Sequence, residues 1–122
     1  MTSCLIVDDS KVVRKLECRI MEDLGFTVFE AKDGQKAYEF CSEKMPDMIL
    51  LDWHMPVMNG LEFLKMLRAM PGGDVPKVVF CTTESEMSNI MQALELGANE
   101  YIMKPFDGEI VKGKLEQIGM TF

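Results

Sequence analysis

The 122 residues are enough for one ordinary domain with a single hydrophobic core, so we expect one domain over residues 1–122 without a separate output domain. With 48% hydrophobic and 27% charged residues, the composition is close to the average of soluble globular proteins. The formal net charge of −7 argues against direct binding to nucleic acid or to an anionic membrane, because both require a basic face on the protein.

Cysteine usage and the amino terminus indicate the compartment. The single histidine and the absence of a CxxC pair argue against a zinc site built from the four cysteines, Cys4, Cys18, Cys41 and Cys81. The first seven residues lack the basic region and the long apolar stretch of a signal peptide, and no apolar run reaches transmembrane length. We therefore expect a protein of the reducing cytoplasm.

Five short apolar segments alternate along the chain with longer segments of helical periodicity. The expected strands are Cys4–Val7, Thr27–Phe29, Met48–Leu51, Val78–Cys81 and Tyr101–Met103. Four of them are apolar at nearly every position, which is typical of parallel strands buried on both faces.

The segments between the strands carry helix signals. Ser10 is a suitable N-cap and Gly25 a suitable stop for a first helix, whose apolar residues recur at three- and four-residue steps at Val13, Leu16, Ile20 and Leu24. Asp33 and Asp107, each followed by glycine, stand where two later helices should begin.

Strict alternation of five strands with five helices predicts an α/β fold. Such a chain forms a doubly wound parallel sheet with helices on both sides and right-handed crossovers. The flavodoxin-like strand order 2-1-3-4-5 is one of the two common orders for these sheets. In this order strands one and three are neighbours at the point where the strand order reverses, and ligands bind beside the carboxyl ends of the strands there.

Polar residues follow four of the five predicted strands. The first strand ends in Asp8 and Asp9, the third in Asp52, the fourth in Thr82 and the fifth in Lys104. The second strand carries no such residue, and the expected order places it outside the pocket. We therefore expect these side chains to meet at one edge of the sheet.

Three carboxylates in one pocket repel one another, and a hard divalent cation relieves that repulsion. Mg²⁺ prefers a few carboxylate oxygens, a carbonyl and several waters. With a lysine ammonium opposite, such a site can bind a phosphoryl group while an aspartate oxygen attacks phosphorus.

Each of these residues also has an ordinary structural explanation. Asp8 or Asp9 alone is more often a helix cap, although Ser10 is the better cap here. Lys104 alone is usually a solvated surface charge, and Thr82 alone can complete a turn. Their joint occurrence at four predicted strand ends favours a functional site.

Together these residues resemble the receiver domains of two-component response regulators, in particular the single-domain chemotaxis type. The resemblance covers almost the whole chain. Its motifs are Val7-Asp8-Asp9-Ser10, Asp52-Trp53-His54-Met55-Pro56 with Asn59-Gly60, Thr82, and Tyr101-Ile102-Met103-Lys104-Pro105-Phe106.

The resemblance implies that Asp52 is the phosphoacceptor and that a histidine kinase or a histidine phosphotransfer protein is the donor. Asp9 and Asp52 would bind Mg²⁺ directly, with the backbone carbonyl of His54, and Asp8 would assist through water. Lys104 would pair with the phosphoryl oxygens, and its peptide bond to Pro105 would be cis.

The resemblance also implies a switch. Thr82 would hydrogen-bond the phosphoryl group, and the ring of Tyr101 would enter the space that Thr82 leaves. The surface affected would be the fourth helix, fifth strand and fifth helix, which would bind an unknown protein target. We expect a monomer that catalyses only its own phosphorylation and dephosphorylation, not a turnover enzyme.

Three positions near the site vary within the family or depart from its pattern. Thr83 stands where the family usually has Ala or Gly, and its bulk can narrow access to Asp52. His54 and Glu84 lie near the expected path of an attacking water. We hypothesise that these residues tune the lifetime of the phosphorylated state.

Other functions remain open at this point. A flavodoxin-like electron carrier needs a Ser/Thr/Gly-rich phosphate loop after the first strand, where this chain has two aspartates. A phosphatase of the haloacid-dehalogenase type needs a second Asp at the place of His54. A phosphate sink or a phosphorelay intermediate would use the same receiver chemistry for another purpose.

Overall fold

The structure is a computed structural model, and it describes residues 2–53, 55–83 and 89–120. Its strands are β1 (Ser3–Val7), β2 (Thr27–Ala31), β3 (Met48–Asp52), β4 (Lys77–Thr82) and β5 (Glu100–Met103). Its helices are α1 (Lys11–Asp23), α2 (Gly34–Glu43), α3 (Gly60–Ala69), α4 (Ile90–Glu95) and α5 (Gly108–Gln117).

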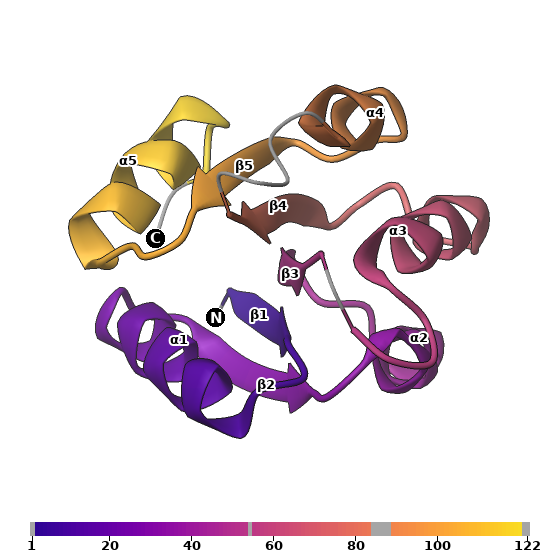
Figure 1. Ribbon diagram of the computed structural model, residues 1–122, viewed down its shortest axis with the longest axis horizontal. Helices are drawn as coiled ribbons and strands as arrows, with labels where there is room; N and C mark the ends of the chain where they lie inside the picture. The colour runs from indigo at the N-terminus through magenta and orange to yellow at the C-terminus, as the bar shows by residue number, and fades with distance from the viewer. Residues whose placement is uncertain (1, 54, 84–88, 121–122) are drawn as a thin grey trace.

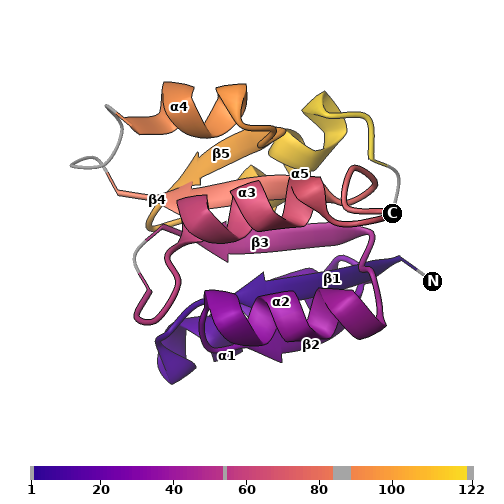
Figure 2. The same cartoon turned by 90° about the vertical axis from the view of Figure 1, so that its right-hand side faces the viewer.

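The five strands form one parallel sheet in the order β2-β1-β3-β4-β5, so the predicted doubly wound α/β fold is confirmed. Helices α1 and α5 cover one face of the sheet, and α2, α3 and α4 cover the other (Figure 1). The view toward the face covered by α2, α3 and α4 shows these helices side by side over the strands (Figure 2). None of the described helices is long and apolar enough to cross a membrane.

The central strands bury side chains on both faces, as their unbroken apolar sequence predicts. In β1, Leu5 packs with the core under α2, α3 and α4, whereas Ile6 packs with the core under α1 and α5. Strand β2 lies at the edge of the sheet and is only partly buried. It continues to Ala31 through the exposed Glu30, two residues beyond the predicted end, because an edge strand tolerates a charged residue on its open side.

The predicted caps of α1, α2 and α5 are present. The side chains of Ser10, Asp33 and Asp107 each accept a hydrogen bond from a backbone N–H in the first turn of α1, α2 and α5. Each such cap contributes about 1 kcal/mol to helix stability. Helix α1 ends before Gly25, whose φ of 99° lies in the left-handed region that favours glycine.

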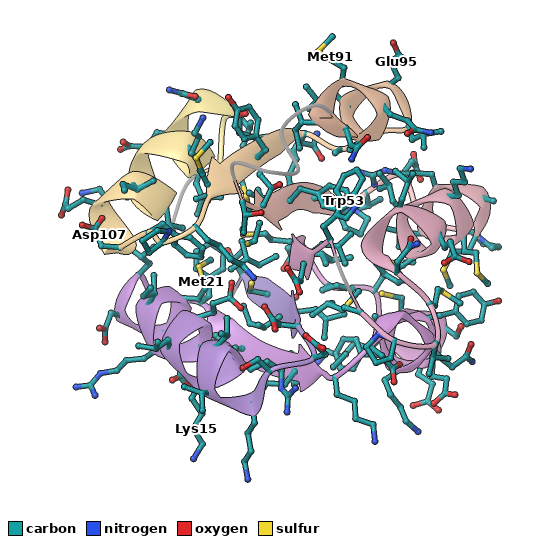
Figure 3. The ribbon with its side chains drawn as sticks, viewed as in Figure 1. Lys15, Met21, Trp53, Met91, Glu95 and Asp107 are labelled. Carbon is teal, nitrogen blue, oxygen red and sulfur yellow. The ribbon has the colours of Figure 1, made fainter. Side chains whose placement is uncertain are left out.

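The burial of α1 differs from the prediction based on its apolar residues. Leu16 is 60% exposed, while Glu17 and Met21 are the buried residues of this helix. Figure 3 shows Met21 directed between α1 and the sheet and Lys15 directed to solvent. The helix is therefore rotated so that a carboxylate, rather than Leu16, faces the sheet near its carboxyl edge.

Helix α3 begins very close to the end of β3. The N–H of Gly60 donates to the carbonyl oxygen of Trp53 at 3.0 Å. A Cβ at Gly60 would collide with the carbonyl oxygen of Asp52 and would lie 2.8 Å from the ring of Phe80. Glycine is therefore required for α3 to pack this closely behind Asp52.

Candidate functional site

Three aspartates lie together at the carboxyl edge of the sheet. Strands β1 and β3 are paired up to Val7 and Leu51, so the residues that follow them emerge side by side. Asp8, Asp9 and Asp52 each offer a carboxylate oxygen, and these oxygens lie within 4.8 Å of one another. The structure therefore brings these three acids together at this edge, as the sequence predicts.

Lys104 reaches the acids from the far side of β4. Its Nζ donates to Oδ1 of Asp52 at 2.9 Å and to Oδ2 of Asp8 at 3.2 Å. The backbone N–H of Lys104 donates to the carbonyl oxygen of Thr82 at 2.7 Å, which fixes the start of this segment against β4. The Lys104–Pro105 peptide bond is cis.

Burial and charge shift the ionisation of both partners of this pair. Burial raises the pKa of Asp52, and the charge of Asp8 adds to the rise, while the hydrogen bond and charge of Lys104 oppose it. Burial alone lowers the pKa of Lys104, but the hydrogen bond and charge of Asp52, followed by Asp8, raise it above its ordinary value. The site therefore holds a firmly charged ammonium beside a carboxylate that is costly to ionise.

The two adjacent acids have different surroundings. Asp8 is 2% exposed, and its Oδ1 accepts a hydrogen bond from the N–H of Ser10 at 2.9 Å. Its other oxygen accepts from Lys104. Asp9 is exposed to solvent. Asp8 is thus fixed by the protein, and Asp9 is accessible to a ligand from solution.

The expected switch residues lie on adjacent strands. Thr82 is fully buried at the end of β4, and its hydroxyl donates to the carbonyl oxygen of Thr83 at 3.3 Å. The side chain of Tyr101 in β5 is partly buried, and the Nζ of Lys114 lies 4.7 Å from the centre of its ring. Thr83 is exposed. His54 and Glu84, the other expected tuning residues, lie outside the described residues.

Glu17 is a buried acid near the site that the sequence analysis did not single out. It is 4% exposed, and its Oε2 accepts a hydrogen bond from the Cys81 thiol at 3.5 Å. Burial, followed by the charge of Asp8, raises the pKa of Glu17 to about 7, although Lys104 opposes the rise. Its spacing of four residues from both Val13 and Met21 was the available signal, since it places Glu17 on their side of the helix.

Arg14 is a second residue that the sequence analysis missed. Its Nη1 donates to the carbonyl oxygen of Asp8 at 2.7 Å, and its Nε forms an ion pair with Glu30 at 3.1 Å. The sequence carries no clear signal for these contacts, because they join α1 to the end of β1 and to β2.

Comparison with known proteins identifies the family. The sequence model of the response regulator receiver domain family matches residues 4–116 of this chain. A CheY homolog from Campylobacter jejuni, named as a chemotaxis protein, is 36% identical over 116 residues, which cover 93% of this chain and 89% of that protein. The chemotaxis protein CheY of Pseudomonas aeruginosa is also 36% identical, with 93% of each chain covered.

A solved structure agrees with these matches. The chemotaxis response regulator CheY4 of Vibrio cholerae superposes with a TM-score of 0.89 at 30% identity, covering 97% of this chain and 98% of that one.

Other relatives are longer. The phosphate regulon transcriptional regulatory protein PhoB of Klebsiella pneumoniae is 36% identical over 115 residues, and this chain spans about half of its length (50%). The chain thus matches most of the length of these CheY-like proteins and about half of a larger regulator. The resemblance found in the sequence motifs is confirmed, and the chain belongs to the receiver domain family of two-component response regulators, with a CheY-like fold.

Proposed function

We propose that the chain receives a phosphoryl group on the carboxylate of Asp52 from the phosphohistidine of a histidine kinase or a histidine phosphotransfer protein. The observation that carries this proposal is the contact of Lys104 with both Asp52 and Asp8 at the edge of the acid cluster. This arrangement combines a nucleophilic carboxylate with a fixed positive charge for the transferred group. The receiver family membership supports the same assignment.

The donor set of the cluster fits Mg²⁺. Three carboxylates within 4.8 Å supply oxygen ligands, which a hard divalent cation prefers over nitrogen or sulfur. Asp9 and Asp52 would hold the ion directly, the backbone carbonyl of His54 would complete the protein ligands, and Asp8 would contribute through water. When bound, Mg²⁺ neutralises charge on the cluster and on the transferring oxygens.

The reaction follows from the residues around Asp52. Lys104 engages Oδ1 of Asp52, so we assign Oδ2 as the attacking oxygen. A bond forms between this oxygen and phosphorus while the P–N bond of the phosphohistidine breaks, and its electron pair returns to the imidazole nitrogen. The Lys104 ammonium then transfers its hydrogen bond to a phosphoryl oxygen and stabilises the charge there.

The signal would leave the site through Thr82 and Tyr101. The Thr82 hydroxyl would exchange its bond to the Thr83 carbonyl for one to the phosphoryl group. The ring of Tyr101 would then move inward, and the surface formed by α4, β5 and α5 would change its affinity for a protein target. The modification would be stoichiometric, because the chain is itself the acceptor.

Incubation with Mg²⁺ and acetyl phosphate, followed by intact-mass measurement, tests the proposal. We expect one base-labile phosphoryl adduct on the wild-type chain and none in EDTA. The Asp52→Asn variant should remain unmodified, and Lys104→Gln should be modified much more slowly. Equal modification of Asp52→Asn and the wild-type chain would refute the assignment of the acceptor.

A further inference from the structure

A partly buried arginine holds the backbone of the acid cluster. The side chain of Arg14 is only 15% exposed, and its guanidinium contacts two segments that are distant in sequence. Nη1 donates to the carbonyl oxygen of Asp8 at 2.7 Å, and Nε pairs with Oε1 of Glu30 at 3.1 Å. The planar guanidinium can make both contacts at once, which a lysine ammonium at the end of a flexible stem cannot do with the same geometry.

The carbonyl that Arg14 contacts belongs to the peptide unit that joins Asp8 to Asp9. A peptide unit is planar, so holding its oxygen restricts the direction in which the chain continues into Asp9. The side chain of Asp8 is already held by Ser10 and Lys104. The direction of the exposed Asp9 therefore depends in part on the peptide plane that Arg14 holds.

The positive charge of Arg14 indicates that its place beside the acid cluster has a structural reason. A positive charge beside a cation site repels the cation, so electrostatics alone disfavours an arginine there. Glu30 partly offsets this charge, and as a residue of the edge strand β2 it also fixes the guanidinium in place. Arg14 therefore fixes the backbone at Asp8, although its charge repels a bound cation to some extent.

We infer that Arg14, held by Glu30, is a positioning residue for the metal site, which orients Asp9 through the Asp8 carbonyl. This inference rests on the proposed binding of Mg²⁺ to the acid cluster. Groups that orient metal ligands typically change metal affinity by 10- to 100-fold when they are removed. Because Arg14 acts on a backbone group, we expect the lower end of this range, about tenfold.

Titration of the phosphodonor-free protein with Mg²⁺ tests the inference, with Trp53 fluorescence as the readout. Trp53 directly follows Asp52 and is 8% exposed, so its signal reports the site without any phosphorylation. We expect R14Q and E30Q each to weaken Mg²⁺ binding, R14Q by about tenfold. R14K keeps the charge and should not restore the affinity.

The sign of the effect separates positioning from charge. If only charge mattered, R14Q would tighten Mg²⁺ binding, E30Q would loosen it, and the double variant R14Q/E30Q, which has the net charge of the wild type, would bind normally. If Arg14 positions Asp9, the double variant binds several-fold more weakly than the wild type. R19Q removes an exposed arginine from the same helix and should not weaken binding.

Unfolding in urea with EDTA shows whether each variant is folded before the titration. Should R14Q prove too unstable, R14K decides the question, because charge alone predicts wild-type Mg²⁺ affinity for R14K and positioning predicts weaker binding. A double variant or an R14Q protein with wild-type or tighter Mg²⁺ affinity overturns the inference, while wild-type binding and labelling leave the proposed function intact. A wild-type chain that does not bind Mg²⁺ overturns both.

Discussion

Replacement of Glu17 by glutamine should stabilise the protein at alkaline pH and leave its stability nearly unchanged in mild acid. Glu17 is 4% exposed beneath the site, and its pKa rises from the ordinary 4.5 to about 7, first because of burial and second because of the charge of Asp8. Between these two values the folded chain holds a proton that the unfolded chain has lost. Glutamine keeps the shape of the side chain and removes the titration.

The magnitude follows from the two pKa values. The stabilisation associated with the bound proton is fully present below pH 4.5, decreases as the pH rises, and is lost above about pH 7. The pKa rise of Glu17 from 4.5 to about 7, at about 1.4 kcal/mol per pKa unit, corresponds to about 3 kcal/mol. We expect Glu17→Gln to exceed the wild type by a value of this order at pH 8.

Urea denaturation in EDTA, from pH 5 to pH 8, provides the measurement. The free energy of unfolding of the wild type should fall relative to Glu17→Gln as the pH rises through this window. Glu22→Gln is the matched control, because Glu22 is exposed on the same helix and its replacement should change stability by less than about 0.5 kcal/mol at every pH. A constant difference between Glu17→Gln and the wild type across the window would refute the reasoning.

Three other substitutions test local contributions to the stability of the fold, and one of them also tests the support of Asp52. Gly60→Ala should destabilise the fold by about 1–3 kcal/mol and reduce labelling by acetyl phosphate, because its Cβ meets the carbonyl of Asp52; urea denaturation and intact mass measure the two effects. Val57 is a β-branched residue with a φ of 70°, so Val57→Asn should raise the free energy of unfolding by about 1 kcal/mol; an equal or lower value would contradict the strain. Arg68 donates to the carbonyl oxygens of Gly73 and Pro76 and to that of Gly97, so Arg68→Lys should cost about 2 kcal/mol of stability in thermal or urea unfolding. Folded Arg68→Lys protein should still be labelled by acetyl phosphate at the wild-type rate.

The local sequence determined much of the fold and the position of the site. Unbroken apolar segments alternating with helical segments predicted a parallel sheet, because only such a sheet buries both faces of its strands. The carboxyl ends of parallel strands meet at one edge, so the sequence predicts that Asp8, Asp52 and Lys104 lie together. Caps such as Ser10 act within one helical turn, and the sequence therefore predicted them well.

The tertiary structure decided which side of each helix faces the sheet and which distant groups pair. The apolar spacing of α1 did not reveal that Leu16 is exposed while Glu17 is buried, since the rotation of a helix is set by packing against the sheet and α5. The contacts of Arg14 with the Asp8 carbonyl and with Glu30 join three elements, and no periodicity within one segment encodes them. Periodicity tells which residues share a face, whereas the competition for burial among all elements determines where that face points.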